Sequence, residues 1–319
     1  MSLKALERHL EPLQPFLEMD EVTEICINQP GELFVERGGM FERREVDELE
    51  YDFLSAFAGL VAELNSKDYP APLIEGSLLN GERVQFVLPP ACEAGKVICS
   101  IRRHRMKQMK LADYEAKGAF ASLRNRSKHG DIDSQLHELF QEKNYLLFIK
   151  EAIHARKNIL ICGGTGTGKT TFLNACLKEI AEHERLITVE DTREVIIDQP
   201  NKVNLLFNEN DTAINAQQIF KACLRLRPDR IFLSELRGAE VWSYLRAANS
   251  GHPGSITTVH ADSVEGAFTQ LVFMMQQARS TSTEEQLRSY IQSIIHIVVK
   301  LKRDPEKFVV VEDVWFANK

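Results

Sequence analysis

A glycine-rich run in the middle of the chain has the composition and spacing of a phosphate-binding loop. Residues 163–170 read GGTGTGKT, which satisfies the pattern G-x-x-x-x-G-K-[ST]. Glycines let successive backbone N–H groups turn inward toward phosphate oxygens, and a helix beginning here adds the positive end of its dipole. Lys169 is expected to reach the β- and γ-phosphates, and Thr170 to offer its hydroxyl to Mg²⁺. The expected nucleotide-binding residues are Gly163, Gly164, Thr165, Gly166, Thr167, Gly168, Lys169, Thr170 and Thr171.

The segments on either side of this run support the same interpretation. Residues 158–162 (NILIC) have the pattern of a buried strand, and residues 170–183 (TTFLNACLKEIAEH) that of a helix. A strand, a glycine-rich turn and a helix in this order are the context that the motif requires. The alternative, a glycine-rich turn with a chance lysine, would not need these flanks.

Two later apolar segments each end in an acid. In RIFLSE (230–235) the strand delivers Glu235, a candidate carboxylate on the magnesium side of the site. Ser234 stands where an aspartate is usual, so we expect metal contact through water. In LITVE (186–190) the strand delivers Glu190, which could orient and partly deprotonate the attacking water. The structural alternatives are an acid that merely ends a strand, and an Asp191-Thr192 pair that caps a helix.

A fourth polar segment, GHPGSITTVHA (251–261), combines glycines, hydroxyls and two histidines. His260 could sense whether the γ-phosphate is present and pass this to a neighbouring subunit. His252 is the weaker candidate, because a lone histidine more often has a structural role.

The pattern around these segments predicts an α/β half. Short apolar runs at 158–162, 186–189 and 231–233 are typical of strands buried on both faces of a mainly parallel sheet. Helical patterns follow them at 215–224 and 240–248, and two antiparallel strands are expected at 294–300 and 308–311.

The first hundred residues have a different organisation, which predicts a small α+β unit. Leucines at helical spacing indicate a short helix within 3–17, and Asn80-Gly81 is the strongest hairpin signal. The other expected elements are strands at 22–28, 33–36, 77–79, 83–88 and 97–101 and a helix at 51–64. A polar and partly basic stretch follows. The expected domains are therefore 1–104, a linker at 105–142, and 143–319.

Composition limits the class of protein. The chain has 319 residues, 39 Lys and Arg against 46 Asp and Glu, and a net charge of -7, which argues against wholesale nucleic-acid binding but leaves a local basic patch open. Six cysteines without a C-x-x-C pair fit a reducing cytoplasm. Neither a secretory signal nor a membrane-spanning run is predicted, so any membrane association is expected to be peripheral.

Taken in order, the four polar segments resemble the sequence boxes of the hexameric traffic ATPases of bacterial secretion. These boxes are Walker A (GGTGTGKT), the Asp box (ITVEDTRE), Walker B (RIFLSELRG) and the His box (GHPGSITTVHA). In the N-terminal half, VTEICINQPGELFVE, NGERVQFVLPPA and ICSIRRHR look like the type IV secretion branch. The resemblance covers nearly the whole chain and is weakest at 105–144.

The resemblance implies an α/β fold in which a RecA-like P-loop ATPase domain follows a smaller α+β N-terminal domain, with ATP and Mg²⁺ as cofactors. It also implies that the N-terminal domain lies over the nucleotide and contributes arginines to its phosphates. The matching positions are Arg83 and either Arg102 or its neighbour Arg103, and Arg237 is a similar case. Without the resemblance these would read as surface arginines.

The same resemblance implies a homohexamer docked peripherally at the cytoplasmic face of the bacterial inner membrane. Its partners would be inner-membrane type IV secretion proteins, including other secretion ATPases. ATP binding would close the two domains, and hydrolysis would reopen them to drive substrate export or pilus assembly in a conjugation-type system. Direct nucleic-acid binding and an exchange of domains between neighbours through the linker stay open.

Two alternatives compete with this interpretation. A type IV pilus motor or nucleic-acid translocase would keep the ATPase and change its work, and a slow nucleotide-gated scaffold would have no need of a water-orienting Glu190. The cysteine spacing gives no four-cysteine zinc element of the type II kind, which makes a type II motor and zinc less favoured.

Overall fold

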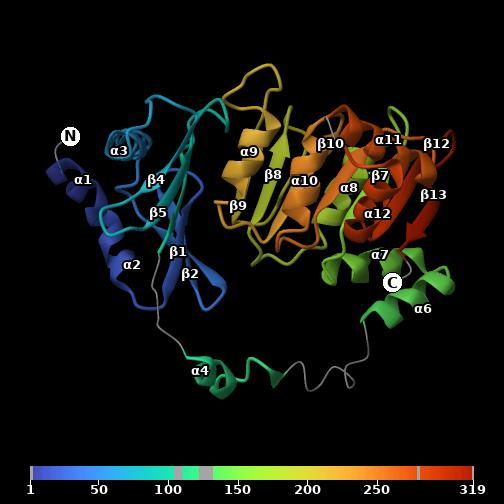
Figure 1. Cartoon of the computed structure of the whole chain (residues 1–319), viewed down its shortest axis with the longest axis horizontal. Helices are drawn as coiled ribbons and strands as arrows, with labels where there is room; N and C mark the ends of the chain where they lie inside the picture. Colours follow the sequence, from blue (N-terminus) through green and yellow to red (C-terminus); the bar gives the residue numbers. More distant parts are fainter. Residues whose placement is uncertain (1–2, 104–109, 122–131, 279–280, 318–319) are drawn as a thin grey trace.

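The computed structural model describes residues 3–103, 110–121, 132–278 and 281–317, which form two β-sheets placed side by side (Figure 1). The N-terminal sheet is wholly antiparallel. Its strands, in spatial order, are β3 (Met40–Glu45), β2 (Glu32–Arg37), β1 (Val22–Ile27), β6 (Ile98–Arg102), β5 (Arg83–Val87) and β4 (Leu73–Ser77).

Helices cover one face of this sheet and complete its hydrophobic core. They are α1 (Leu3–Leu10), a 3₁₀ turn (Glu11–Leu13), α2 (Gln14–Glu18) and α3 (Tyr51–Leu64). The leucines that predict an amphipathic helix, such as Leu6 and Leu13, are fully buried there. An apolar helix stripe and one apolar sheet face thus exclude water together, which is the main stabilisation of such a unit.

The C-terminal sheet is the framework of the polar segments singled out in the sequence. Its spatial order is β13 (Phe308–Phe316), β12 (Ile297–Asp304), β7 (Ile159–Cys162), β11 (Ile256–Val259), β10 (Arg230–Leu236), β8 (Leu186–Glu190) and β9 (Lys202–Leu206). All pairs are parallel except β12 with β13. The polar segments therefore follow the carboxyl ends of neighbouring parallel strands, where ligands bind in open α/β sheets.

Both faces of this sheet are covered, which explains the wholly apolar strands. In β7, Leu160 and Cys162 face one core while Ile159 and Ile161 face the other. One face carries α9 (Ala216–Cys223), α10 (Glu240–Ala248), α11 (Val264–Gln277) and α12 (Glu284–Ile294). The other carries α6 (Ile132–Gln141), α7 (Tyr145–His154) and α8 (Lys169–Leu177).

Most predicted elements are confirmed, but some have other bounds and some were not predicted. The helices at 51–64 and 240–248 have the predicted bounds, and Gly81, with φ +88°, turns the β4–β5 hairpin. The strand expected at 77–79 instead ends at Ser77, and the predicted helix at 170–183 ends at Leu177. Strands β3 and β9 were not predicted, and neither were the helices α7 (Tyr145–His154), α11 (Val264–Gln277) and α12 (Glu284–Ile294).

The expected linker contains two described helices, α4 (Leu111–Ala116) and α6. Leu136 and Leu139 of α6 are buried in the core under α7 and α8, so the C-terminal core begins before residue 143. Residues 104–109 and 122–131 of the expected linker lie outside the described part of the chain. The remaining domain boundaries stay predictions.

Polar contacts join the two sheets along the β9 edge. Asn28 donates to Asn201 at 3.0 Å, and the fully buried Arg185 donates to Asn28 at 2.7 Å. Cys92 also pairs with Leu205 of β9 in an isolated antiparallel β-bridge of the backbone. Four strand spacings separate β9 from β7 in the sheet, which is roughly 19 Å. The N-terminal sheet thus contacts the edge of the C-terminal sheet that lies away from β7. Within the described residues, no helix is both long enough and apolar enough to cross a bilayer.

Candidate nucleotide-binding site

The glycine-rich run forms a tight loop between β7 and α8. Gly168 has φ +77°, and a Cβ there would meet Val309 at 3.0 Å. A Cβ on Gly163 would lie 2.8 Å from the carbonyl oxygen of Leu301. Glycine is therefore required at both positions. Gly168 needs it for backbone conformation and for space, and Gly163 needs it for space. The helix begins at Lys169, so its free N–H groups point into the loop.

Lys169 lies at the centre of this loop and is only 8% exposed. Its ammonium donates to the carbonyl oxygens of Gly163 at 3.0 Å and Gly164 at 3.1 Å. These neutral partners orient the ammonium without cancelling its charge. Burial lowers the pKa of Lys169 from its ordinary value, an effect that the nearby Glu235 charge opposes. An anion entering the loop would find a partly desolvated cation aimed at it.

Glu235 and His260 complete a polar cluster with this lysine. His260 Nε2 lies 2.8 Å from Glu235 Oε1, and His260 Nδ1 lies 3.4 Å from Lys169 Nζ. An ammonium can only donate, so Nδ1 is the acceptor and the ring proton is on Nε2, directed at the carboxylate. Lys169 Nζ itself is 3.9 Å from Glu235 Oε1. Lys169 at the start of α8, Glu235 in β10 and His260 directly after β11 are thus brought together, as predicted.

Further charged groups stand at the mouth of this cluster. Arg237 donates to Glu235 and to Asp191, and Thr170 Oγ1 donates to Glu194 Oε2 at 3.1 Å. The resulting cavity has a volume of about 300 Å³. Its lining consists of Thr165, Gly166, Thr167, Gly168, Lys169, Thr170, Thr171, Asp191, Glu194, Ser234, Glu235, Arg237, Thr258 and His260.

Glu190 differs from its expected position. Its side chain is fully buried and is not part of the cavity lining. Its carboxylate accepts from the backbone N–H groups of Glu194 at 2.9 Å and Val195 at 2.7 Å. Thr188 and Arg193 also donate to it. Glu190 therefore holds the following loop in shape, and the acids of this segment that line the cavity are Asp191 and Glu194. A role for Glu190 in hydrolysis stays a prediction.

His252 also lies away from the cavity lining. Its Nδ1 is 3.0 Å from the carbonyl oxygen of Pro228, and burial lowers its pKa. This is the structural role that the sequence favoured for a lone histidine.

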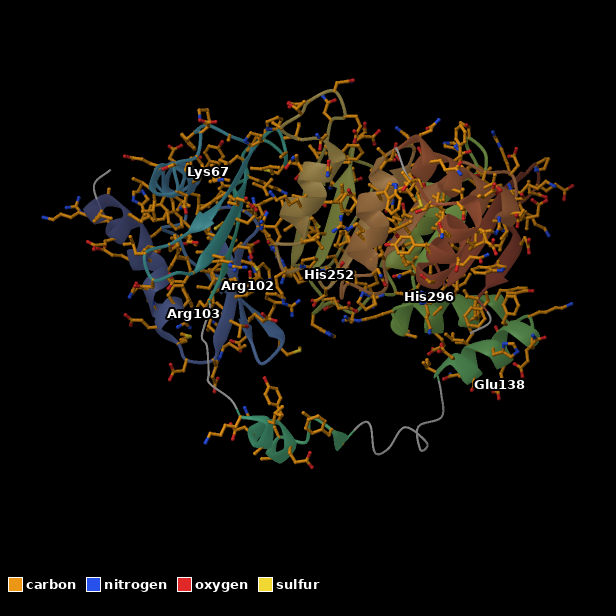
Figure 2. All side chains as sticks on the ribbon, in the orientation of Figure 1. Lys67, Arg102, Arg103, Glu138, His252 and His296 are labelled. Atoms are coloured by element: carbon orange, nitrogen blue, oxygen red, sulfur yellow. The ribbon has the colours of Figure 1, made fainter. Side chains whose placement is uncertain are left out.

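The N-terminal arginines are not brought to the P-loop of their own chain. Arg83 and Arg102 face each other across β5 and β6 and line a separate cavity of about 490 Å³ with Lys67 and Arg225. Arg102 donates to the buried Glu24 at 2.8 Å, and Figure 2 labels it on the N-terminal sheet. This second cavity shares no lining residue with the P-loop cavity among the described residues.

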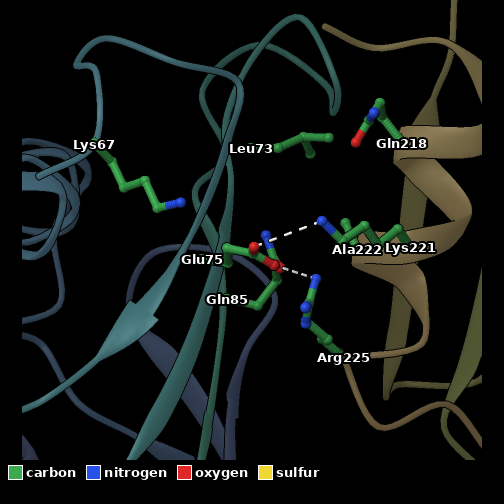
Figure 3. Close-up of a pocket in the computed structure, with 8 residues that line it drawn as sticks. All are labelled: Lys67, Leu73, Glu75, Gln85, Gln218, Lys221, Ala222 and Arg225. Carbon is green, nitrogen blue, oxygen red and sulfur yellow. Dashed lines mark ion pairs between the residues drawn. The ribbon is translucent and has the colours of Figure 1, made fainter. Parts of the chain in front are cut away.

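Figure 3 shows how this side of the N-terminal sheet is attached to α9. Glu75 forms ion pairs with Lys221, at 3.5 Å, and with Arg225, beside a small hollow of about 160 Å³. The N-terminal sheet packs on α9 and β9 of its own chain and not over the P-loop, so the expectation that the N-terminal domain lies over the nucleotide is not met within one chain. Arg103 is held by the backbone, donating to the carbonyl oxygen of Val22 at 3.2 Å.

The residues that sequence reasoning missed are Glu194 and Thr258, while it gave Asp191 only a capping role. Glu194 is four residues beyond Glu190 in EDTRE, so the acids of one short segment were candidates together. Periodicity places Glu190 at the end of a strand, but it does not tell which acid turns toward the loop after that strand.

A glycine-rich loop between a parallel strand and a helix, with a buried lysine and acids at the same sheet edge, defines a P-loop nucleotide-binding protein. The model of the type II/IV secretion system protein family matches residues 96–317. VirB11 of the Brucella suis type IV secretion system is 36% identical over 302 residues, covering 91% of this chain and 84% of that protein. The type IV secretion system protein PtlH of Bordetella pertussis is 34% identical over 330 residues, covering 98% and 96% respectively.

A solved structure agrees with these relatives. The crystal structure of the Brucella suis VirB11 ATPase in complex with sulphate matches with a TM-score of 0.91 and 34% identity, covering 98% of this chain and 94% of that one. The chain belongs to the type II/IV secretion system protein family and is an ATPase of the type IV secretion kind. The predicted fold, a RecA-like ATPase part preceded by a smaller α+β part, is confirmed.

Proposed function

We propose that the P-loop cavity binds Mg²⁺·ATP and that six copies of the chain form a ring whose hydrolysis cycle energises a type IV secretion system. The observation that carries this proposal is the convergence of Lys169, Glu235 and His260 on one glycine-rich loop. In such a site, catalysis is mostly positioning and electrostatic stabilisation. The loop supplies backbone N–H groups, and Lys169 supplies the charge beside the β- and γ-phosphates.

The donor set suits magnesium as well. Thr170 offers a hydroxyl, and Glu235 and Glu194 offer carboxylate oxygens at the same mouth, the hard ligands that Mg²⁺ takes together with water and phosphate. Bound Mg²⁺ would neutralise charge on the β- and γ-phosphates. Glu194 would release the hydroxyl of Thr170 to the metal, and Glu235, with a proton donor in His260, would position water beside the γ-phosphate. Arg237 would hold Glu235 and Asp191 in place.

The direct test is Lys169→Ala, with Lys178→Ala as the matched control on the exposed surface of the same segment. Loss of the central cation should lower turnover on the order of 100-fold or more and weaken binding of a fluorescent ATP analogue. The control should match wild type in both measurements. Wild-type turnover by the Lys169 variant would refute the site.

The ring part of the proposal is supported by the place of the arginines. If Arg83 contacts phosphate, it does so on the P-loop of a neighbouring chain, since it is remote from its own. A head-to-tail ring would deliver this contact at every interface. Arg83 is the residue to change, because Arg102 neutralises the buried Glu24 and its loss would disturb the fold.

Complementation distinguishes a contact between chains from one within a chain. Lys169→Ala and Arg83→Gln chains, each inactive alone, are co-expressed in equal amounts. Sites built from two chains should recover about a quarter of wild-type turnover, because random neighbours restore one interface in four. No recovery would place both groups in one chain, and full activity of Arg83→Gln alone would remove Arg83 from the site.

Location and partners are also part of the proposal. We place the ring at the cytoplasmic face of the inner membrane, against membrane-bound secretion proteins and other secretion ATPases. Support comes from the relatives, which are themselves type IV secretion system proteins. Co-purification of the ring with washed membranes only when the other secretion proteins are present would support docking on protein, and equal binding to bare lipid vesicles would contradict it.

A further inference from the structure

The segment after β8 lies between the P-loop cavity and the N-terminal sheet, and it contacts both. On the cavity side, Glu194 accepts a hydrogen bond from the hydroxyl of Thr170 at 3.1 Å. On the other side, Arg193 Nε donates to Glu93 Oε1 at 3.0 Å. Glu93 belongs to the connection between β5 and β6, a hundred residues earlier in the chain. Adjacent residues of one short segment therefore contact two different parts of the molecule.

Arg193 is held firmly at this position. Its Nη1 donates to Glu190, whose carboxylate is fully buried, and to the carbonyl oxygen of Val195 at 3.3 Å. The same carboxylate accepts the backbone N–H of Glu194 at 2.9 Å. A shift of Glu194 therefore changes the anchor of the Arg193 guanidinium. A planar guanidinium serves two carboxylates at once, which an ammonium cannot do with the same geometry.

The β5–β6 connection is bonded to strand β9 of the C-terminal sheet. Leu206, at the end of β9, donates its N–H to the carbonyl oxygen of Ala91 at 2.8 Å, and Cys92 bridges Leu205. Ion pairing with Lys96 and Arg193 holds the pKa of Glu93 below its ordinary value, so the carboxylate is charged at neutral pH. Glu93 is thus a charged contact on a short connection with little freedom of its own.

We propose that Arg193 is a positioning residue that couples occupancy of the P-loop cavity to the β5–β6 connection of the N-terminal sheet through Glu93. This rests on the proposed function in one respect, namely that the occupant is a nucleotide. A magnesium ion or phosphate that takes the Thr170 hydroxyl removes it from Glu194, and the loop from 190 to 195 adjusts. Arg193 carries that adjustment to Glu93. By linkage, the connection also influences nucleotide affinity by the same factor.

Hydrogen exchange of residues 91–97, with and without Mg²⁺·ADP, tests this coupling. In the wild-type chain, nucleotide should change the exchange rate there by roughly fivefold or more, the lower end of ordinary coupling between sites. Glu93→Gln should abolish that change while the exchange of 163–177 still responds to nucleotide. Arg193→Lys should act similarly, because it keeps the charge and loses the double contact.

Lys96→Gln is the matched control, because it removes the other cation that pairs with Glu93 and leaves Arg193 intact. It should retain the nucleotide effect on residues 91–97. An undiminished effect in Glu93→Gln, or an equal loss in Lys96→Gln, would overturn the coupling. A wild-type chain that binds nucleotide without any change at 91–97 would overturn it too, whereas absence of nucleotide binding at 163–177 would instead refute the proposed function.

Discussion

Replacing Glu190 with glutamine is expected to destabilise the fold, before any effect on chemistry is considered. The buried carboxylate accepts from two backbone N–H groups, from Thr188 and from Arg193. Glutamine keeps the shape but turns one oxygen into an N–H donor, which faces donors, and it leaves Arg193 without its buried counter-charge. Arg193 keeps its second partner, Glu93, so the cost comes mainly from the buried N–H groups that lose their acceptor, and together with the lost charge it is roughly 3 kcal/mol.

That cost determines how far Tm should fall. For a core of this size, 1 kcal/mol shifts Tm by about 2–4 °C, so 3 kcal/mol predicts a fall of roughly 6–12 °C. The assay is thermal unfolding of wild type and Glu190→Gln without nucleotide, at one protein concentration so that assembly does not differ. The matched control is Glu194→Gln, whose exposed side chain should change stability by no more than about 0.5 kcal/mol.

The two variants should separate folding from chemistry. Glu194→Gln should keep the wild-type Tm and lose turnover and magnesium affinity, because its carboxylate lines the cavity. Glu190→Gln should have both a lower Tm and a lower turnover. A Glu190 variant with the wild-type Tm and no turnover would refute the structural reasoning and restore Glu190 as the acid beside the water.

Two more predictions concern the loop itself. Gly168→Ala should weaken ATP binding and stability more than Gly166→Ala, although both have positive φ at a cost of roughly 1–2 kcal/mol, since only the Cβ at 168 meets Val309; equal effects in calorimetric binding and unfolding would contradict this contact. Because the pKa of Lys169 in the free chain is lowered, its protonated fraction falls earlier as pH rises, and ATP affinity should start to decline below the ordinary lysine value of 10.5. Lys169→Arg, which stays charged, should flatten that alkaline decline in a binding titration.

The fold could be predicted where local pattern and tertiary environment agree. Strands such as 159–162 are apolar on both faces, and the helix at 240–248 has an unbroken stripe, so their sequences leave little choice. Strand β3 (MFERRE) was missed because it is an edge strand rich in charges, with its side chains exposed or half-buried. Its pairing with β2 comes from the backbone and not from burial, and periodicity cannot report it.

The functional site could likewise be predicted only in part. The loop around Lys169 is one continuous motif, so its geometry follows from residues 163–170 alone. The choice between Glu190 and Glu194 depends on how a loop leaves β8 and which backbone N–H groups need an acceptor, which are tertiary facts. The place of Arg83 depends on how one sheet docks on another and on which chain lies next to it. The spacing of the residues predicts neither the choice between the two acids nor the place of Arg83.

The segment after β8 links the nucleotide site to the N-terminal sheet. The cavity is built at the carboxyl ends of β7, β8, β10 and β11, and the segment that ends β8 is also the one that reaches β9 and the N-terminal sheet. A change in charge at the P-loop thus acts on a segment that is already bonded to the other sheet. The N-terminal sheet carries the arginines proposed to contact the nucleotide of a neighbouring chain. The contact between Arg193 and Glu93 would therefore couple each nucleotide site to the next one around a ring.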